Sequence, residues 1–173
     1  ILWEITKYCN YQCKHCCASA NLVDTKNELS TKECKAILKQ LKNFGIEEIY
    51  FSGGEPFSRS DILEILQTAK DYNITCNIST NGSFLTEKIA KELSKLNINK
   101  VHISLDSNIE EDFNEFRGGK YFEPTINAIK LLKKHNIYVR VGTVIWQKNY
   151  KNLENMIKYL YSLKVDEIVF NWL

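Results

Sequence analysis

The sequence predicts an α/β fold, with six parallel strands in one sheet and helices outside it. Short runs rich in β-branched and aromatic residues recur along the 173-residue chain, and amphipathic helix patterns lie between them. The hydrophobic fraction of 44% is sufficient for a buried core. No internal repeat and no Pro/Gly-rich linker interrupts the alternation, so we expect a single domain over residues 1–173.

The expected strands are short and rich in β-branched or aromatic residues. They cover residues 2–6, 48–52, 75–79, 101–105, 138–145 and 167–170. Because a helix pattern rather than a tight hairpin turn lies between successive strands, neighbouring strands are expected to run parallel.

The first expected helix follows Ser30 and Glu33, which have the spacing of a capping box. Cys34 lies on the apolar face of this helix. Asp61 and Thr86 are expected to cap the next two helices. The remaining two helices are expected over residues 124–135 and around Leu153, Met156, Ile157 and Leu160.

Two closures of such a sheet fit the pattern: a doubly wound open sheet and a barrel-like curl. In both, ligands bind at the carboxyl-terminal ends of the strands. Motifs that follow successive strands are therefore the candidates for a shared site.

Cys9, Cys13 and Cys16 form a C-x-x-x-C-x-x-C pattern directly after the first strand. Thiolates are the usual ligands of iron–sulfur clusters, and three of them leave one iron of a cubane open to a small molecule. A zinc or structural site is the alternative. Cys34 and Cys76 fall on expected core faces, and we expect Cys17 to be a packed thiol.

Further polar and glycine motifs follow the second, third and fourth strands. Glycines admit close backbone approach, and carboxylates accept hydrogen bonds from ammonium groups. The motifs are Gly53-Gly54-Glu55-Pro56, Ser79 and Asn81, and Ser104 and Asp106, with Arg117 in an expected loop before the fourth helix. His102 lies deeper in the fourth strand and is expected to be a satisfied core histidine. Asn149, after the fifth strand, is expected to cap a helix.

Composition excludes several classes of function. A formal net charge of +2, from 23 basic and 21 acidic residues, gives no basis for nucleic-acid or membrane attraction. No apolar run approaches the roughly 20 residues that span a bilayer. The clustered cysteines and the absence of a signal peptide predict a reducing, cytoplasmic setting.

These motifs together resemble the radical S-adenosylmethionine (SAM) superfamily, and the resemblance covers essentially the whole chain. It implies a partial (β/α)6, TIM-like barrel in which Cys9, Cys13 and Cys16 hold a 4Fe–4S cluster. It also implies reductive cleavage of SAM to a 5′-deoxyadenosyl radical, which takes a hydrogen atom from the substrate. The SAM-binding residues that it implies are His15, Gly53, Gly54, Glu55, Pro56, Ser79, Asn81, Ser104, Asp106 and Arg117.

The local pattern is most similar to peptide-modifying members with a C-terminal cysteine-rich (SPASM-type) domain. Because the chain begins at Ile1, we expect a fragment of a longer protein. A peptide or protein substrate is expected, with a reductant such as ferredoxin or flavodoxin. The alternatives are an enzyme acting on a small molecule, such as a tetrapyrrole or cofactor precursor, and a non-catalytic zinc or iron–sulfur module.

Overall fold

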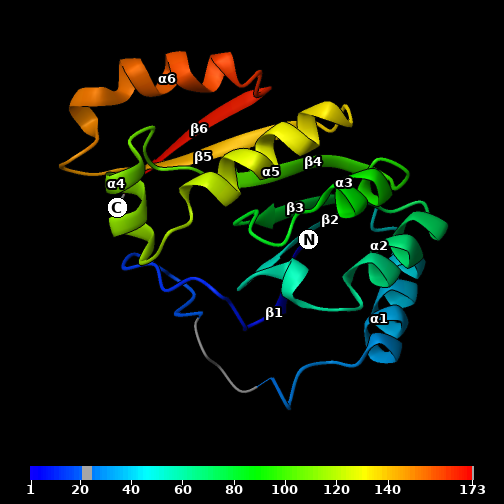
Figure 1. Ribbon diagram of the computed structural model, residues 1–173. Coiled ribbons are helices and arrows are strands. Elements are labelled where there is room, and N and C mark those ends of the chain that lie inside the picture. The colour runs from blue at the N-terminus through cyan, green and yellow to red at the C-terminus, as the bar shows by residue number, and fades with distance from the viewer. Residues whose placement is uncertain (21–24, 173) are drawn as a thin grey trace.

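The computed structural model describes residues 1–20 and 25–172 and contains one curved sheet with helices outside it (Figure 1). The six strands are all parallel and lie side by side in chain order. They are β1 (Leu2–Thr6), β2 (Glu48–Gly53), β3 (Thr75–Thr80), β4 (Ile98–Ser104), β5 (Val139–Ile145) and β6 (Glu167–Trp172). A doubly wound sheet would reverse its strand order, so this order selects the barrel-like curl.

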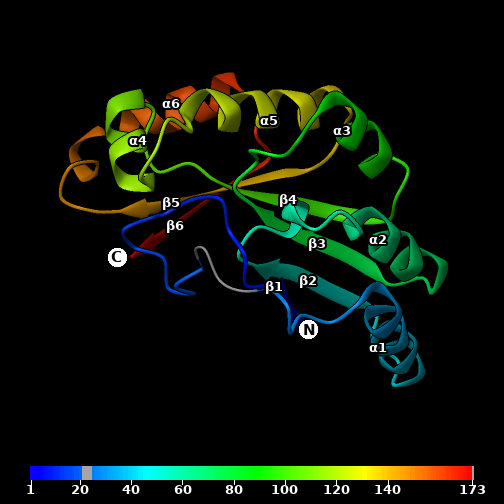
Figure 2. The same cartoon turned by 60° about the horizontal axis from the view of Figure 1, so that its bottom comes forward.

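The helices lie along one face of this sheet, as Figure 2 shows. They are α1 (Thr31–Asn43), α2 (Ile62–Asp71), α3 (Glu87–Leu93), α4 (Glu110–Arg117), α5 (Phe122–Lys134) and α6 (Leu153–Ser162), with short 3-10 turns η1 (Pro56–Ser58) and η2 (Tyr150–Asn152). None of the helices in the described residues is long and apolar enough to cross a membrane.

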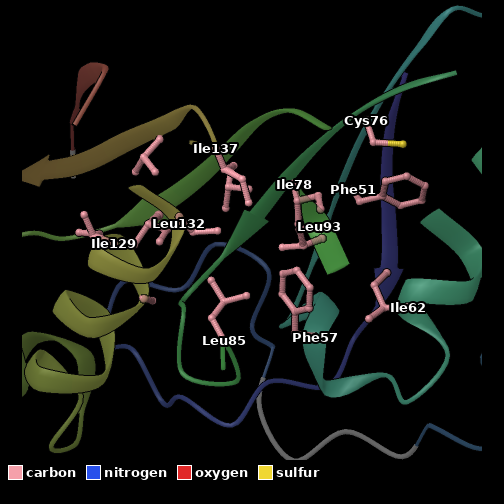
Figure 3. Close-up of a cluster of buried hydrophobic side chains, with 14 of the residues drawn as sticks. Phe51, Phe57, Ile62, Cys76, Ile78, Leu85, Leu93, Ile129, Leu132 and Ile137 are labelled. Atoms are coloured by element: carbon pink, nitrogen blue, oxygen red, sulfur yellow. The ribbon is translucent and has the colours of Figure 1, made fainter. Parts of the chain in front are cut away.

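The core lies between the helices and the strands, where alternate strand residues point toward the helices (Figure 3). Phe51, Ile78 and Ile103 on three neighbouring strands are fully or almost fully buried. Each such side chain contributes about 1.5–3 kcal/mol by leaving water. Cys34 and Cys76 belong to this core, as expected.

The opposite face of the sheet is polar, and we call it the inner face. It carries Ser52, Ser79, His102 and Arg140, which alternate along their strands with the buried residues. This face and the carboxyl-terminal strand ends are the surfaces that the helices leave uncovered.

Two helix starts follow the sequence. The Oγ of Ser30 accepts a hydrogen bond from the Glu33 N–H at 3.4 Å, and the Ser30 N–H donates to Glu33 Oε2 at 2.8 Å. Thr86 Oγ1 accepts from the Ile89 N–H at 3.3 Å. Asp61 precedes α2, but its carboxylate does not cap the helix, because Arg59 and Thr31 occupy it instead.

Four further expectations were wrong. His102, expected to be a core histidine, lies on the inner face of the sheet instead. Residues expected to form a loop before the fourth helix include α4, which ends at Arg117. Cys17, expected to be packed, is exposed. The Asn149 side chain caps no helix, because its amide donates to the carbonyl oxygens of Asp106 and Val144 at 2.8 and 2.7 Å.

Candidate functional site

Residues 7–20, the cysteine loop, run from β1 across the carboxyl-terminal ends of the strands (Figure 2). A cavity of about 240 Å³ lies between this loop and the strand ends. Cys9, Cys13 and Cys16 all line it. The other lining residues come from the loop, from four strand ends and from α4: Tyr11, His15, Cys17, Ala18, Ala20, Ser52, Gly53, Gly54, Ser79, Thr80, Asn81, Ser104, Arg117 and Val144.

The three thiols are close neighbours within this cavity. The Cys16 N–H donates to the Cys13 carbonyl at 3.2 Å, which turns the loop back on itself. Burial raises the pKa of Cys9 and of Cys13, and neighbouring thiols raise them further: Cys13 acts on Cys9, and Cys16 acts on Cys13. Bound iron reverses this preference, because a coordinated thiol is deprotonated.

Nitrogen donors point at two of the sulfur atoms. The Tyr11 N–H donates to Cys9 Sγ at 3.4 Å, and Asn81 Nδ2 donates to the same sulfur at 3.7 Å. Arg117 Nη1 donates to Cys13 Sγ at 3.6 Å. Hydrogen bonds of this kind stabilise thiolates and tune the potential of iron–sulfur clusters.

The Gly53-Gly54 turn packs directly against the backbone at the end of β1 and the start of the cysteine loop. A Cβ at Gly53 would lie 2.1 Å from the Thr6 carbonyl oxygen, and one at Gly54 would lie 2.0 Å from the Tyr8 carbonyl oxygen. The Gly54 N–H donates to Thr6 O at 2.8 Å, and the Glu55 N–H donates to Tyr8 O at 2.7 Å. The close approach that requires glycine here is therefore to the loop that carries the cysteines.

Glu55 is fully buried and does not line the cavity. Its Oε1 accepts from the Phe57 N–H at 3.0 Å and from Thr80 Oγ1 at 2.7 Å, and its Oε2 accepts from the Asn81 N–H at 2.7 Å. Burial raises the pKa of Glu55 to about 7. The carboxyl group fastens the turn after β2 to the end of β3.

Asn81 connects the end of β3 to the cysteine loop. Besides its contact with Cys9, its Nδ2 donates to Asn10 Oδ1 at 3.0 Å, and its Oδ1 accepts from Ser83 Oγ at 2.6 Å. Asn10 Nδ2 donates to the same serine oxygen at 2.9 Å. This network fixes Cys9 relative to the sheet.

Asp106 and Arg117 form a buried ion pair behind the cavity wall. Arg117 Nε and Nη2 both lie 2.6 Å from Asp106 Oδ2, and Asp106 Oδ1 accepts from the Val144 N–H at 2.9 Å. The remaining guanidinium nitrogen points at Cys13. Asp106 therefore orients Arg117 toward the cysteine loop, while Arg117 itself lines the cavity.

An aromatic stack covers one side of the site. The His15 ring stacks on Phe116 and Phe116 stacks on Trp146, each pair with ring centroids 4.0 Å apart. Burial lowers the pKa of His15. Tyr11 stacks on Tyr121 at 3.6 Å on the other side of the loop. These aromatic partners from α4 and from the segment after β5 were not foreseen from the sequence.

The cavity brings together most of the residues expected to act there. They are Cys9, Cys13, Cys16, His15, Gly53, Gly54, Ser79, Asn81, Ser104 and Arg117. Glu55, Pro56 and Asp106 are buried behind the surface and hold it in place. A larger hollow of about 680 Å³ lies around Arg59, whose guanidinium is paired with Asp61 and Glu28 at 2.8 and 3.7 Å.

The cavity offers three thiols, and thiolates are the usual ligands of iron–sulfur clusters. Within residues 1–20 and 25–172, no three His, Cys, Asp or Glu side chains are grouped so as to hold one metal ion. A cubane is bound through one sulfur per iron, so its thiols need to line the same cavity. The three cysteines meet that requirement, and N–H donors already point at two of their sulfur atoms.

Comparison with known proteins agrees with this chemistry. A family model described as the radical SAM superfamily matches residues 3–160. An Fe-coproporphyrin III synthase from Methanosarcina barkeri is 34% identical over 171 residues, which cover 98% of this chain and 43% of that protein. The mycofactocin maturase MftC of Mycobacterium tuberculosis is 32% identical over 155 residues, which cover 89% of this chain and 39% of that protein. The chain thus spans less than half the length of these curated relatives.

Among solved structures, Streptococcus suis SuiB bound to S-adenosylmethionine superimposes with a TM-score of 0.87 at 21% sequence identity. The match covers 99% of this chain and 40% of that chain. At this identity the likeness establishes the fold, a partial TIM-like barrel of six parallel strands.

Proposed function

The chain belongs to the radical SAM superfamily, whose members use a 4Fe–4S cluster and SAM, and from this premise we propose that Cys9, Cys13 and Cys16 bind the cluster of an enzyme that abstracts hydrogen from its substrate. When bound, such a cluster supplies the electron that splits the sulfonium of SAM into methionine and a 5′-deoxyadenosyl radical. One observation carries the proposal: the three cysteines share a cavity with the ends of three strands that hold the other expected ligands.

The residues around the cavity have distinct roles in this proposal. Gly53 and Gly54 keep the cysteine loop against the sheet and present backbone groups to SAM. Ser79, Asn81 and Ser104 offer polar groups along the cavity wall. Glu55 and Asp106 act indirectly, because each is fully buried and holds in place a residue that lines the cavity.

Two residues take roles that depend on a bound nucleoside. His15 and its aromatic stack form a flat apolar wall suited to a purine ring. Arg117 faces both Cys13 and the cavity, so its charge acts on the thiolate and on any carboxylate bound beside it.

The substrate class has two candidates. A peptide or protein is favoured by the similarity to a mycofactocin maturase, and a tetrapyrrole or related cofactor precursor is favoured by the similarity to an Fe-coproporphyrin III synthase. In either case a low-potential donor such as ferredoxin or flavodoxin reduces the cluster. Transfer of deuterium from a labelled substrate into 5′-deoxyadenosine distinguishes the two candidates.

Anaerobic reconstitution with iron and sulfide, followed by dithionite and SAM, tests the proposed function. The protein should yield 5′-deoxyadenosine, and Cys13→Ala should lose both the cluster and the product because a thiolate ligand is missing. Cys34→Ala is the matched control, because this buried thiol lies in the core away from the cavity. Full iron content and SAM cleavage in Cys13→Ala would refute the assignment.

A further inference from the structure

Four ionisable side chains lie next to one another on the inner face of the sheet: Lys100 and His102 on β4, Arg140 on β5 and Glu167 on β6. We call them the inner-face cluster. The strand pairing places His102 beside Arg140 and Arg140 beside Glu167. Their neighbours Val101, Ile103, Val139 and Val141 are fully buried on the helix side. Strand alternation therefore directs the four side chains to the other face.

The inner-face cluster borders the cysteine cavity. Ser104, which lines the cavity, follows His102 by two residues on the same strand face, a separation of about 7 Å. Gly142 pairs with Ser104, and a Cβ there would lie 2.4 Å from His102 Nε2. Glycine at this position makes room for the imidazole ring beside Ser104, the cavity residue nearest to the cluster on β4.

The cluster carries excess positive charge. Arg140 Nη2 donates to Glu167 Oε1 at 2.6 Å, and Lys100 Nζ lies 3.5 Å from Glu167 Oε2, so two cations share one carboxylate. Burial and the nearby Arg140 lower the pKa of His102, which keeps its ring neutral at neutral pH. Glu48, on β2, is not a member of the cluster, and its carboxylate accepts a hydrogen bond from Asn77 Nδ2 at 2.8 Å.

Arg140 also has a buried donor without a partner. Its Nε makes no hydrogen bond to any residue within 1–20 or 25–172. By contrast, Arg59 Nε donates to Asp61 at 2.9 Å and Arg117 Nε donates to Asp106 at 2.6 Å. A buried N–H without an acceptor is unfavourable, and a guanidinium edge matches the two oxygens of a carboxylate.

We propose that Arg140 and Lys100 bind a carboxylate of the substrate, which anchors it on the inner face beside the cysteine cavity. That the carboxylate belongs to a substrate rests on the proposed function, whereas the anion site itself does not. One carboxylate neutralises the single excess charge of the cluster and supplies the missing acceptor. A phosphate monoester would bring about 1.5 to 2 negative charges and overcompensate it.

Nuclear magnetic resonance of the arginine Nε–H groups tests the site directly, because the chain has only three arginines, Arg59, Arg117 and Arg140. The reconstituted, oxidised protein with SAM is titrated with acetate, with its neutral analogue acetamide and with inorganic phosphate. Acetate should shift the Arg140 signal in a saturable way. Arg59, whose Nε already has a carboxylate partner, should remain unchanged.

Variants assign the signal and separate the site from general charge effects. Arg140→Gln should remove only the responding signal, and Lys100→Gln should weaken the acetate response several-fold. Lys130→Gln removes an equal charge from the exposed face of α5 and should leave the response unchanged. The Arg59 and Arg117 signals report whether each variant is folded.

Several outcomes would overturn the proposal. They are no wild-type response to acetate, an equal response to acetamide, an equal shift at Arg59, or equal weakening by Lys130→Gln. Tighter binding of phosphate than of acetate would overturn the choice of a carboxylate. SAM cleavage is assayed separately on the same preparation: a specific acetate response without 5′-deoxyadenosine would refute the proposed function alone, and the reverse would refute this site alone.

Discussion

Glu55 is a carboxyl group whose two oxygens are both occupied by donors of the same chain. The sequence predicts it as a direct ligand of SAM, but its complete burial places it one layer behind the cavity. In the proposed function, Glu55 acts on SAM through the Gly53-Gly54 turn and Asn81, which it fixes relative to each other.

Replacement of Glu55 by Ala should weaken SAM binding while the cluster still forms. The change leaves Thr80 Oγ1 and two backbone N–H groups without an acceptor, so the free energy of unfolding should fall by about 1–3 kcal/mol. Denaturant unfolding, iron content and calorimetric SAM titration measure the three effects. Glu47→Ala, at an exposed site just before β2, is the control. Loss of the cluster with unchanged SAM affinity would contradict this role.

Asp61 lies in the network that fastens the end of β1 to α1 and α2. Hydrogen bonds from Arg59, and next from Thr31, lower the pKa of Asp61 below its ordinary value of 3.8, against an opposing effect of partial burial. Arg59 also donates to the Ile5 carbonyl at 3.1 Å, so the network reaches the strand that leads into the cysteine loop.

The stabilising effect of Asp61 should depend on pH in the acid range. A carboxyl group with a lowered pKa stabilises the folded state above its unfolded pKa and loses that effect as the pH falls through its folded pKa. Asp61→Asn should therefore be less stable than wild type at pH 7, and the difference should shrink below about pH 4. Urea unfolding at several pH values measures it, with the exposed Glu47→Gln as control. A difference that is independent of pH would argue against the charged pair.

At the scale of elements, α4 determines one wall of the site. The helix ends at Arg117, and Gly118 takes a left-handed conformation with φ of 78°. Phe116 supplies a carbonyl oxygen to the Lys14 N–H at 3.4 Å and a ring to His15. The helix and the cysteine loop are thus joined by backbone and by stacking contacts.

Gly118→Ala should be more harmful than Gly45→Ala, although both glycines have φ of 78°. Alanine in this conformation costs about 1–2 kcal/mol at either position. At Gly118 the new Cβ would also lie 2.7 Å from the Gln12 carbonyl oxygen, whereas nothing lies within 4 Å at Gly45. Thermal unfolding should show the larger loss for Gly118→Ala, together with lower iron content. Equal losses would mean that the contact with Gln12 is easily relieved.

For the molecule as a whole, cofactor binding and folding are coupled. A ligand that binds only the folded state at a hundred times its Kd stabilises it by about 2.7 kcal/mol. SAM should therefore raise the unfolding temperature of the reconstituted protein under anaerobic conditions. In Cys13→Ala, which cannot complete the cluster, SAM should have little effect. A similar rise in both proteins would show that SAM binds without the open iron.

Much of the fold follows from periodicity, because parallel strands buried by helices on one face leave a strong alternating pattern. Phe51, Ile78 and Ile103 illustrate it, and the six strands lie within a few residues of their expected positions. Helix α4 was missed because it has only eight residues and an acidic first turn, so its sequence resembles that of a loop. Phe113 and Phe116 at helical spacing, followed by Gly118, are the signal that identifies it.

The sequence likewise identifies only part of the candidate site. The spacing of Cys9, Cys13 and Cys16 and the strand-end motifs are local features of the sequence, so they could be named before the fold was seen. The pairing of Asp106 with Arg117, and the direction of Arg117 toward Cys13, depend on how α4 packs. No spacing in the sequence encodes that packing, and the inner-face cluster likewise requires the register of three strands.

Gly53, Gly54 and Gly118 contact the end of β1 and the cysteine loop at carbonyl oxygens, those of Thr6, Tyr8 and Gln12. Main-chain atoms are common to every amino acid, so side chains at positions 8 and 12 can drift over evolutionary time without displacing the sulfur atoms. Positions 53, 54 and 118 have no such latitude. Related sequences should accordingly vary at positions 8 and 12 and keep glycine at positions 53, 54 and 118.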